Sequence, residues 1–384
     1  MKTKILYIIS VIGFLTIGLI QAKEVIVKKE TFNYPAKQNS TLSIKNQFGD
    51  IEIVNSTKDR IEVEVSVSLG SKKMRNEYYK QSVENIDIIS TRKGSNIEIY
   101  TVLPRKLKSK GSFKVNYLVK TPDYVDMKLK NSFGNIIAGK MSANCKISVK
   151  FGSLIINELI AEKNTENTSE IALSFSKNSK VDEAQNIDLK LAHSECKINK
   201  AKILNVKSNF SELNVDEAEK LNINSKHDDI DIAKLNDICI DKGAFSDFSV
   251  KYLKDTIRAN MNFSKLFIDD IHEDFKDINI IKRFGDVDIS IDKDSKFFLD
   301  IKNEHGDVDL DHDFIVKWIY DSHEKKELKD LDIDHDFTET KVYGTHGILK
   351  KIIGKSCVDI DTSDNVTKII IRSKHGDVKI DKTE

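Results

Sequence analysis

Residues 46–53 read NQFGDIEI, and residues 373–380 read SKHGDVKI. Each copy holds an aromatic ring or a histidine, then glycine, an acidic residue and an alternation of apolar and polar residues. Degenerate copies of this phrase recur at twelve ring positions, which we term anchors: Phe48, Phe133, Phe151, Phe175, His193, Phe210, His227, Phe245, Phe263, Phe284, His305 and His375. Between Phe133 and His305 the anchors lie 17–24 residues apart, a period typical of one solenoid turn.

The positions around the anchors form four apolar columns, three and five residues after each anchor and four and six residues before it. Each column is apolar in eleven of the twelve turns, whereas the overall composition predicts about five. Alternate residues of a strand share one face. Each turn is therefore predicted to hold two short strands, one on either side of the anchor, with inward-facing apolar side chains.

The predicted fold is all-β: a parallel β-helix, or solenoid, of turns of about 17–21 residues with an N-terminal β-rich cap. Turns stacked in chain order at about 4.8 Å give a rod of roughly 55 Å. The residue after each anchor is Gly, Ser or Asp, which favours a corner that a bulky Cβ would obstruct. The anchor rings are expected to pack at this corner as part of the filling, together with Cys145, Cys196 and Cys239, which fall in apolar columns.

The interruptions of the repeat give the predicted domains. Residues 1–22 are a signal peptide, 23–125 the first turn and a cap with a short helix within 72–85, 126–313 the regular solenoid, 314–358 an irregular inserted lobe or hairpin, and 359–384 the final turn. The signal peptide is predicted because Lys2 and Lys4 precede an apolar run, residues 5–20, that ends before Gln21-Ala22. An uncleaved N-terminal anchor is the alternative.

The mature chain is therefore expected to be exported, to the periplasm, the outer surface or the medium, without a transmembrane span. Basic and acidic residues number 61 each, so the formal net charge is zero. No overall field favours nucleic acid or an anionic membrane, and no nucleic-acid partner is predicted.

The candidate chemistry is sparse. His193, His227, His305 and His375 occupy the same column as eight phenylalanines, so we interpret them as structural. No Ser/His/Asp arrangement, P-loop or dinucleotide fingerprint occurs in a suitable context. The sequence predicts no enzyme, no cofactor and no resident metal.

Two candidate binding regions remain. Asp286, Asp288, Asp307, Asp309 and Asp311 alternate with inward apolar residues and form an outward acidic stripe. The stripe could attract Ca²⁺ or a cationic partner, but Ca²⁺ needs six to eight converging oxygens, and a solvated outer face is the favoured interpretation. The second region is the 314–358 lobe, whose only tryptophan, Trp318, is a candidate for an exposed contact.

At residues 46–53, 131–136 and 373–380, behind the apolar N-terminal segment, the chain resembles the bacterial putative-adhesin, or "toastrack", β-solenoid family. The resemblance covers most of residues 40–384. It implies an exported cell-envelope protein, and no catalytic residues are established for the family that could be carried over.

The leading hypothesis is a non-catalytic, adhesin-like envelope or surface protein that presents a rigid solenoid face to a glycan, matrix or protein partner. One alternative is a sensory or regulatory domain for envelope stress. Another is a polysaccharide-active β-helix enzyme, by analogy of fold alone. Such an enzyme needs clustered arginines or paired acids in a groove, and the mature-chain arginines are scattered: Arg60, Arg75, Arg92, Arg105, Arg258, Arg283 and Arg372.

Overall fold

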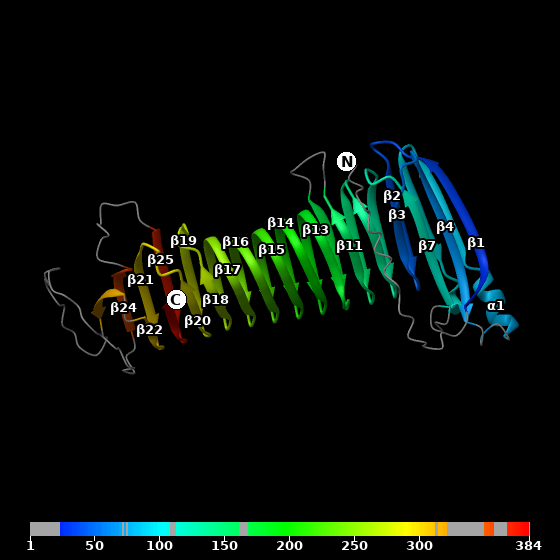
Figure 1. Ribbon diagram of the computed structural model, residues 1–384. Coiled ribbons are helices and arrows are strands. Elements are labelled where there is room, and N and C mark those ends of the chain that lie inside the picture. Colours follow the sequence, from blue (N-terminus) through cyan, green and yellow to red (C-terminus); the bar gives the residue numbers. More distant parts are fainter. Residues whose placement is uncertain are drawn as a thin grey trace, which may run out of the picture.

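The computed structural model describes residues 24–70, 73, 76–107, 113–160, 168–311, 314–320, 349–356 and 367–383. These residues form one 26-stranded, mostly parallel assembly, a long stack of turns (Figure 1). The all-β solenoid predicted from the sequence is confirmed. The predicted signal peptide, residues 1–22, lies outside the described ranges.

Each turn consists of a strand segment before the anchor and a segment after it. Early turns use separate strands: β2 (Thr41–Gln47), β3 (Ile51–Asn55), β8 (Asp126–Ser132), β9 (Ile136–Met141), β10 (Cys145–Lys150), β11 (Leu154–Leu159) and β12 (Ser169–Ser174). In the middle, one strand continues from one anchor to the next: β13 (Ser179–Ala192), β14 (Glu195–Asn209), β15 (Glu212–Lys226), β16 (Asp229–Ala244) and β17 (Asp247–Asn262). The later strands are β18 (Lys265–Ile271), β19 (Asp277–Arg283), β20 (Val287–Ile291), β21 (Phe297–Glu304), β22 (Val308–Leu310), β25 (Thr367–Lys374) and β26 (Val378–Lys382).

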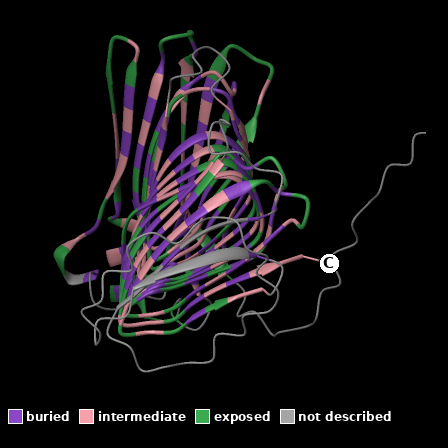
Figure 2. Ribbon diagram, turned by 90° about the vertical axis from the view of Figure 1, so that its left-hand side faces the viewer, coloured by how far each residue is buried: buried purple, intermediate pink, exposed green. Residues whose placement is uncertain are grey.

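The segments before the anchors form one wall of the solenoid, which we call sheet 1, and the segments after them form sheet 2. Buried and exposed residues alternate along both (Figure 2), and the inward side chains make one continuous core. In the turn of Phe48, for example, Leu42, Ile44 and Ile51 are fully buried. Register pairs such as Leu213 with Ile230 stack one column member on the next, so the four predicted columns are confirmed as core.

A fifth buried column fills the bend opposite the anchors and was not predicted. Its members lie about eight residues after the anchor, and they include Met141, Leu159, Ala184, Ala201, Ala218, Leu235, Leu253 and Ile271. The column holds alanine in three middle turns, at Ala184, Ala201 and Ala218. It holds methionine, leucine or isoleucine in the turns on either side of these. The missed column shows that the bend, too, is part of the core.

Single extra residues explain most exceptions to the columns. After Phe175, Asn178 adopts a positive φ of 54° and is additional, so Ser179 and Val181 occupy the column positions and pair with Cys196 and Ile198. In β16, Ile238 and Ile240 pair with Leu221 and Ile223, and an irregularity follows.

This shift corrects the prediction for one cysteine. Cys239 pairs in register with Asn222 on the outer side of sheet 1 and is partly exposed. It is therefore not a core residue, whereas Cys145 and Cys196 are buried as predicted. This turn holds one extra residue, so counting back from the anchor Phe245 placed Cys239 one position away from its true place in the strand. A shift of one residue moves a side chain to the opposite face of a strand.

The anchors themselves take the special backbone conformation. Every anchor has φ between 51° and 64°, the left-handed region, which costs non-glycine residues about 1–2 kcal/mol each. Their rings point outward and form a stack with centroids 4.4–5.1 Å apart along the rod, and Phe133, Phe210 and Phe245 are nearly half exposed. The prediction that the rings belong to the filling is wrong: each ring packs on the rings of neighbouring turns instead.

The residue after the anchor is small because the adjacent turn comes close. A Cβ on Gly134 would lie 1.9 Å from the carbonyl oxygen of Gly49. Where serine stands, its hydroxyl joins the turns: the Ser176 N–H donates to Ser194 Oγ at 3.1 Å, and Ser194 N–H donates to Ser211 Oγ at 3.1 Å. The predicted preference for small residues holds, but its cause is close packing between turns.

The last turn does not follow chain order. β25 lies between β19 and β21, and β26 lies between β20 and β22. The ring of His375 accordingly stacks between Phe284 and His305, at 4.7 and 4.6 Å. The expectation that turns stack in chain order is wrong here, because all turns carry the same columns and the His375 turn fits any gap between two of them.

Extra strands cover the N-terminal end of the stack. They are β1 (Glu24–Pro35), β4 (Arg60–Gly70), β5 (Asp87–Lys93), β6 (Asn96–Val102) and β7 (Phe113–Thr121), with α1 (Glu77–Glu84) and a 3-10 turn, η1 (Arg105–Leu107). β6 pairs with β2 and β7 with β3, and β7, β4 and β1 continue as antiparallel neighbours. The backbone edges of the first turn are thereby paired.

At the other end, β24 (Leu349–Lys355) pairs antiparallel with β21, and β23 (Ile315–Tyr320) pairs with β24. These strands belong to the predicted 314–358 lobe, and residues 321–348 and 357–366 lie outside the described ranges. Trp318 is in β23, opposite Ile352 in register.

Near both ends of the stack, a polar side chain two residues before the anchor donates hydrogen bonds to carbonyl groups at the glycine corners. The Asn131 side chain donates to the carbonyls of Gly49 and Asn135 at 2.8 and 2.9 Å, and Asn303 makes equivalent bonds to Asp307 and Gly376 at 3.1 Å. In the turn of Phe284 a lysine, Lys282, has this position: it is buried, and its ammonium donates to the carbonyls of Gly285 and Asp377.

The anchor conformation gives the first prediction. Replacing Phe245 (φ 53°) by alanine removes the ring and keeps the left-handed strain, whereas glycine removes both. We expect Phe245→Ala to be less stable than Phe245→Gly by about 1 kcal/mol, with both below the wild type, in urea unfolding. Ser249 is the control: in the extended strand β17, alanine should be the more stable of the two substitutions. The same order at both sites would contradict the role assigned to the anchors.

The second prediction concerns Lys282. Burial lowers its pKa from 10.5 to about 8. The unfolded chain therefore binds more protons between these values, so the stability contribution of Lys282 rises as pH rises from 8 to 10.5, by up to about 3 kcal/mol. Lys282→Asn, which copies Asn131 and Asn303, should lack this slope. The measurement is the free energy of unfolding of both proteins at pH 7.5, 9 and 10.5, and a difference that stays constant would refute the assignment.

The third prediction tests the corrected position of Cys239. Burial raises the pKa of Cys145 and of Cys196 to about 12. In a Cys357→Ser background, one thiol of the folded protein should react with a maleimide, and adding Cys239→Ser should abolish the reaction until the chain is unfolded. Partial burial and then Asp241 raise the pKa of Cys239 as well, so its reaction should accelerate with pH. Labelling of Cys145 at the same rate would overturn this placement.

Candidate functional site

The outer side of sheet 1 is rich in lysine, and we call it the basic face. From the turn of Phe133 to that of Phe245 it carries Lys128, Lys130, Lys146, Lys150, Lys190, Lys207, Lys226 and Lys242, all exposed. The acids on the same positions are Glu170, Asp188 and Asp241. Lys146 pairs with Glu170 at 2.7 Å, but Lys190, Lys207 and Lys226 form no ion pair with any residue described.

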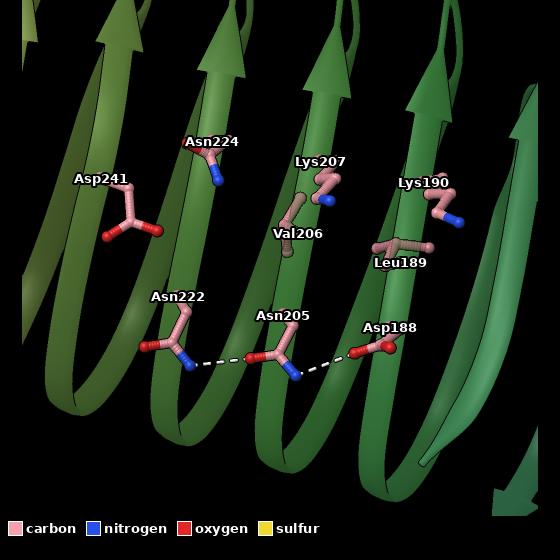
Figure 3. Close-up of a pocket in the computed structure, with 9 residues that line it drawn as sticks. All are labelled: Asp188, Leu189, Lys190, Asn205, Val206, Lys207, Asn222, Asn224 and Asp241. Carbon is pink, nitrogen blue, oxygen red and sulfur yellow. Dashed lines mark hydrogen bonds between the residues drawn. The ribbon is translucent and has the colours of Figure 1, made fainter.

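A shallow groove of about 320 Å³ crosses the basic face (Figure 3). Asp188, Asn205 and Asn222 lie on β13, β14 and β15 and form a hydrogen-bonded row, with the Asn205 amide donating to Asp188 at 2.8 Å and the Asn222 amide to Asn205 at 2.7 Å. Lys190 and Lys207 stand beside this row. The strands place like residues side by side because each pairs in parallel with the next, one residue opposite its homologue.

This arrangement suits binding better than catalysis. Lys190 and Lys207 are register partners on strands about 4.8 Å apart, and the amide row offers both donors and acceptors. The lining residues that the groove brings together are Asp188, Leu189, Lys190, Asn205, Val206, Lys207, Asn222, Asn224 and Asp241.

The ring stack offers less than its exposure suggests. Neighbouring rings are nearly parallel, with interplanar angles of 2–15°, so each ring face is covered by another ring. Only ring edges reach solvent along the stack. A sugar that stacks on an aromatic needs a free ring face, so the stack is not a sugar-binding platform between Phe48 and His305.

The outer side of sheet 2 carries the opposite charge, and we call it the acidic face. From the turn of His193 onward it holds Glu195, Glu212, Asp229, Asp231, Asp247, Asp286, Asp288, Asp307, Asp309 and Asp377. Glu212, Asp229 and Asp247 are direct register partners. Partial burial, and then the charges of Asp231, Asp247 and Glu212, raise the pKa of Asp229, as expected where carboxylates crowd together.

The acidic stripe predicted from the sequence belongs to this face, but its members are not adjacent as expected. The inserted strand β26 places Lys379 opposite both Asp288 and Asp309. The hydrogen bond that the Lys379 ammonium donates to Asp381, and the charges of Asp288 and Asp309, raise the pKa of Lys379. The positively charged side chain of Lys379 thus lies within the acidic stripe. Cation binding by the stripe stays a prediction.

Asp286 and Asp307 also form hydrogen bonds with Asp377 of the inserted turn. The Asp377 N–H donates to Asp286 Oδ1 at 3.1 Å, and the Asp307 N–H donates to Asp377 Oδ1 at 2.8 Å. Asp311 is approached by the Lys382 N–H at 3.4 Å. The carboxylates of Asp286 and Asp377 therefore help to hold the inserted turn between its neighbours.

Among the described residues, a group of three carboxylates lies close together elsewhere. Glu273, Asp292 and Asp294 have oxygens within 4.8 Å of one another, on the links after β18 and β20. Sequence reasoning did not single them out. They are exposed or half-buried, and surface acids of this kind are ordinary on a solvated link.

Sequence reasoning also missed the basic face. The lysines are visible in the sequence two residues apart, as in Lys128 and Lys130, but the formal net charge of zero hides them. Sorting charged residues by their position relative to the anchor, rather than summing them, is the signal that separates the two faces.

No protein-family model matches the chain, and no curated protein matches it significantly. Among solved structures it is similar to a putative cell adhesion protein from Clostridium sporogenes (12% identity over 93% of this chain and 99% of the other, TM-score 0.18). It is also similar to a putative adhesin from Bacteroides fragilis (12%, 69% and 97%, TM-score 0.28). A third is a putative lipid binding protein from Parabacteroides distasonis (14%, 69% and 93%, TM-score 0.22).

The solved proteins that this chain is similar to are described, in the main, as putative adhesins.

Proposed function

We propose that this chain is a non-catalytic, exported surface protein that binds an anionic partner through the basic face. The observation that carries the proposal is the row of exposed lysines on a rigid wall, of which Lys190, Lys207 and Lys226 form no ion pair within the described part of the chain. The adhesin-like names of similar structures and the N-terminal apolar segment support export and a surface location. In the described part of the chain, no helix is long and apolar enough to cross a membrane.

The physical basis is multiplicity. One exposed ion pair contributes about 0–1 kcal/mol, so a single lysine would give little affinity. Lys190 and Lys207 are register partners on neighbouring strands, and Lys226 lies two residues further along the next strand. The parallel strands hold the three lysines in place, so together they can meet charges spread over an extended anion. The groove beside them supplies amide donors and acceptors for the polar groups of the same partner.

The test compares binding of the purified full chain to immobilised dextran sulfate and to immobilised uncharged dextran. The chain should bind the sulfated polymer, and Lys190→Gln/Lys207→Gln/Lys226→Gln should weaken binding roughly tenfold, since each exposed pair contributes about 0.5 kcal/mol. Binding should fall with added salt.

The matched control removes three lysines elsewhere. Lys234→Gln/Lys251→Gln/Lys254→Gln lies on sheet 2 and the bend, and it should bind as the wild type does. Equal loss in both variants would mean that net charge, not the basic face, controls binding. Release of reducing sugar from a panel of polysaccharides would instead favour the polysaccharide-active enzyme.

A further inference from the structure

The two faces of this molecule are complementary to each other. The overall formal charge is zero, yet lysines outnumber carboxylates on the outer side of sheet 1, and carboxylates outnumber lysines on the outer side of sheet 2 from the His193 turn onward. Both faces follow the same strands and share the same turn spacing, because β14, β15 and β16 each contribute to both. Any two copies therefore carry matching rows of opposite charge.

The rows are unfavourable within one molecule. Like charges directly opposite each other on neighbouring strands destabilise a sheet, and Glu212, Asp229 and Asp247 are such neighbours. None of the three forms an ion pair with a described residue. On the basic face, Lys190 and Lys207 are register partners in the same way.

We propose that the anionic partner of the basic face is the acidic face of a second copy of this chain, so that copies associate wall to wall. The inference rests on the proposed function and names its partner. Lys190, Lys207 and Lys226 of one copy meet carboxylates such as Glu212, Asp229 and Asp247 of the next.

The available area is sufficient for such a contact. The seven turns from Phe133 to Phe245 at about 4.8 Å each, and about six residues of strand at 3.3 Å each, give roughly 700 Å² on each copy. Two copies would bury roughly 1,400 Å², in the lower half of the range for specific interfaces. The lysines of the basic face begin at the Phe133 turn, whereas the carboxylates of the acidic face begin at the His193 turn. The two copies are therefore offset from each other along the rod.

The contact does not close on itself. Each copy uses its basic face toward one neighbour and its acidic face toward another, so the interface is heterologous and extends to higher assemblies. A single contact made of exposed ion pairs is weak and sensitive to salt. On a surface that carries many copies, weak contacts add by multivalency.

The experiment uses two charge-reversed variants of the full chain. Lys190→Glu/Lys207→Glu/Lys226→Glu makes both faces acidic, and Glu212→Lys/Asp229→Lys/Asp247→Lys reverses the acidic row so that both faces are basic there. In sedimentation velocity at about 10 mM salt, the wild type should associate more as its concentration rises, and about 500 mM salt should abolish this by screening. Each variant alone should remain monomeric.

The decisive sample is the equimolar mixture. Each variant then meets a partner of opposite charge on both faces, so association at low salt should return to at least half of the wild-type level. Thermal unfolding of each variant checks that it is folded. A mixture that stays monomeric, or a wild type that does not associate, overturns the inference.

The binding test on dextran sulfate separates this result from the proposed function. Binding of dextran sulfate through the basic face without self-association would leave the proposed function standing and remove the second copy as its partner. If the chain neither binds dextran sulfate nor self-associates, both the proposed function and the second copy as its partner are wrong. Association of the wild type that both reversed variants retain would place the contact elsewhere on the molecule.

Discussion

Parallel backbone hydrogen bonding between neighbouring turns determines the rest of this structure. It places each residue on its counterpart one turn away, as in the pairing of Leu213 with Ile230. The inward columns are therefore apolar, the column after the anchor is small and the anchor column is aromatic from turn to turn. The core, the hydrogen bonds between serines of neighbouring turns, the ring stack and both charged faces are consequences of the same register.

The fold could be predicted because its signal is repeated. A single phrase such as residues 46–53 is weak, but twelve copies with four apolar columns define a solenoid of two walls. The details that failed depend on one residue more or less. Asn178 and the irregularity in β16 are absorbed locally, and no count from the anchor can locate a bulge, so Cys239 was assigned to the wrong face.

Stacking order was unpredictable for a different reason. Interchangeable turns leave the sequence no means to specify their neighbours, and the His375 turn satisfies the Phe284 and His305 turns equally well. The candidate site was hidden for a third reason. Its lysines are ordinary in composition, and only the three-dimensional sorting of sheet 1 from sheet 2 turns a neutral chain into one with two opposite faces.

The inserted turn has a consequence for how the chain acquires its structure. Solenoids can fold by adding each new turn to the last one, but here the gap between β19 and β21 must receive residues about 90 positions downstream, as Asp277 pairs with Lys368. Contacts between such distant segments form slowly. Growth from the N-terminal cap can therefore proceed only as far as the Phe284 turn, and the His305 turn can join the stack only once β25 and β26 have reached the gap.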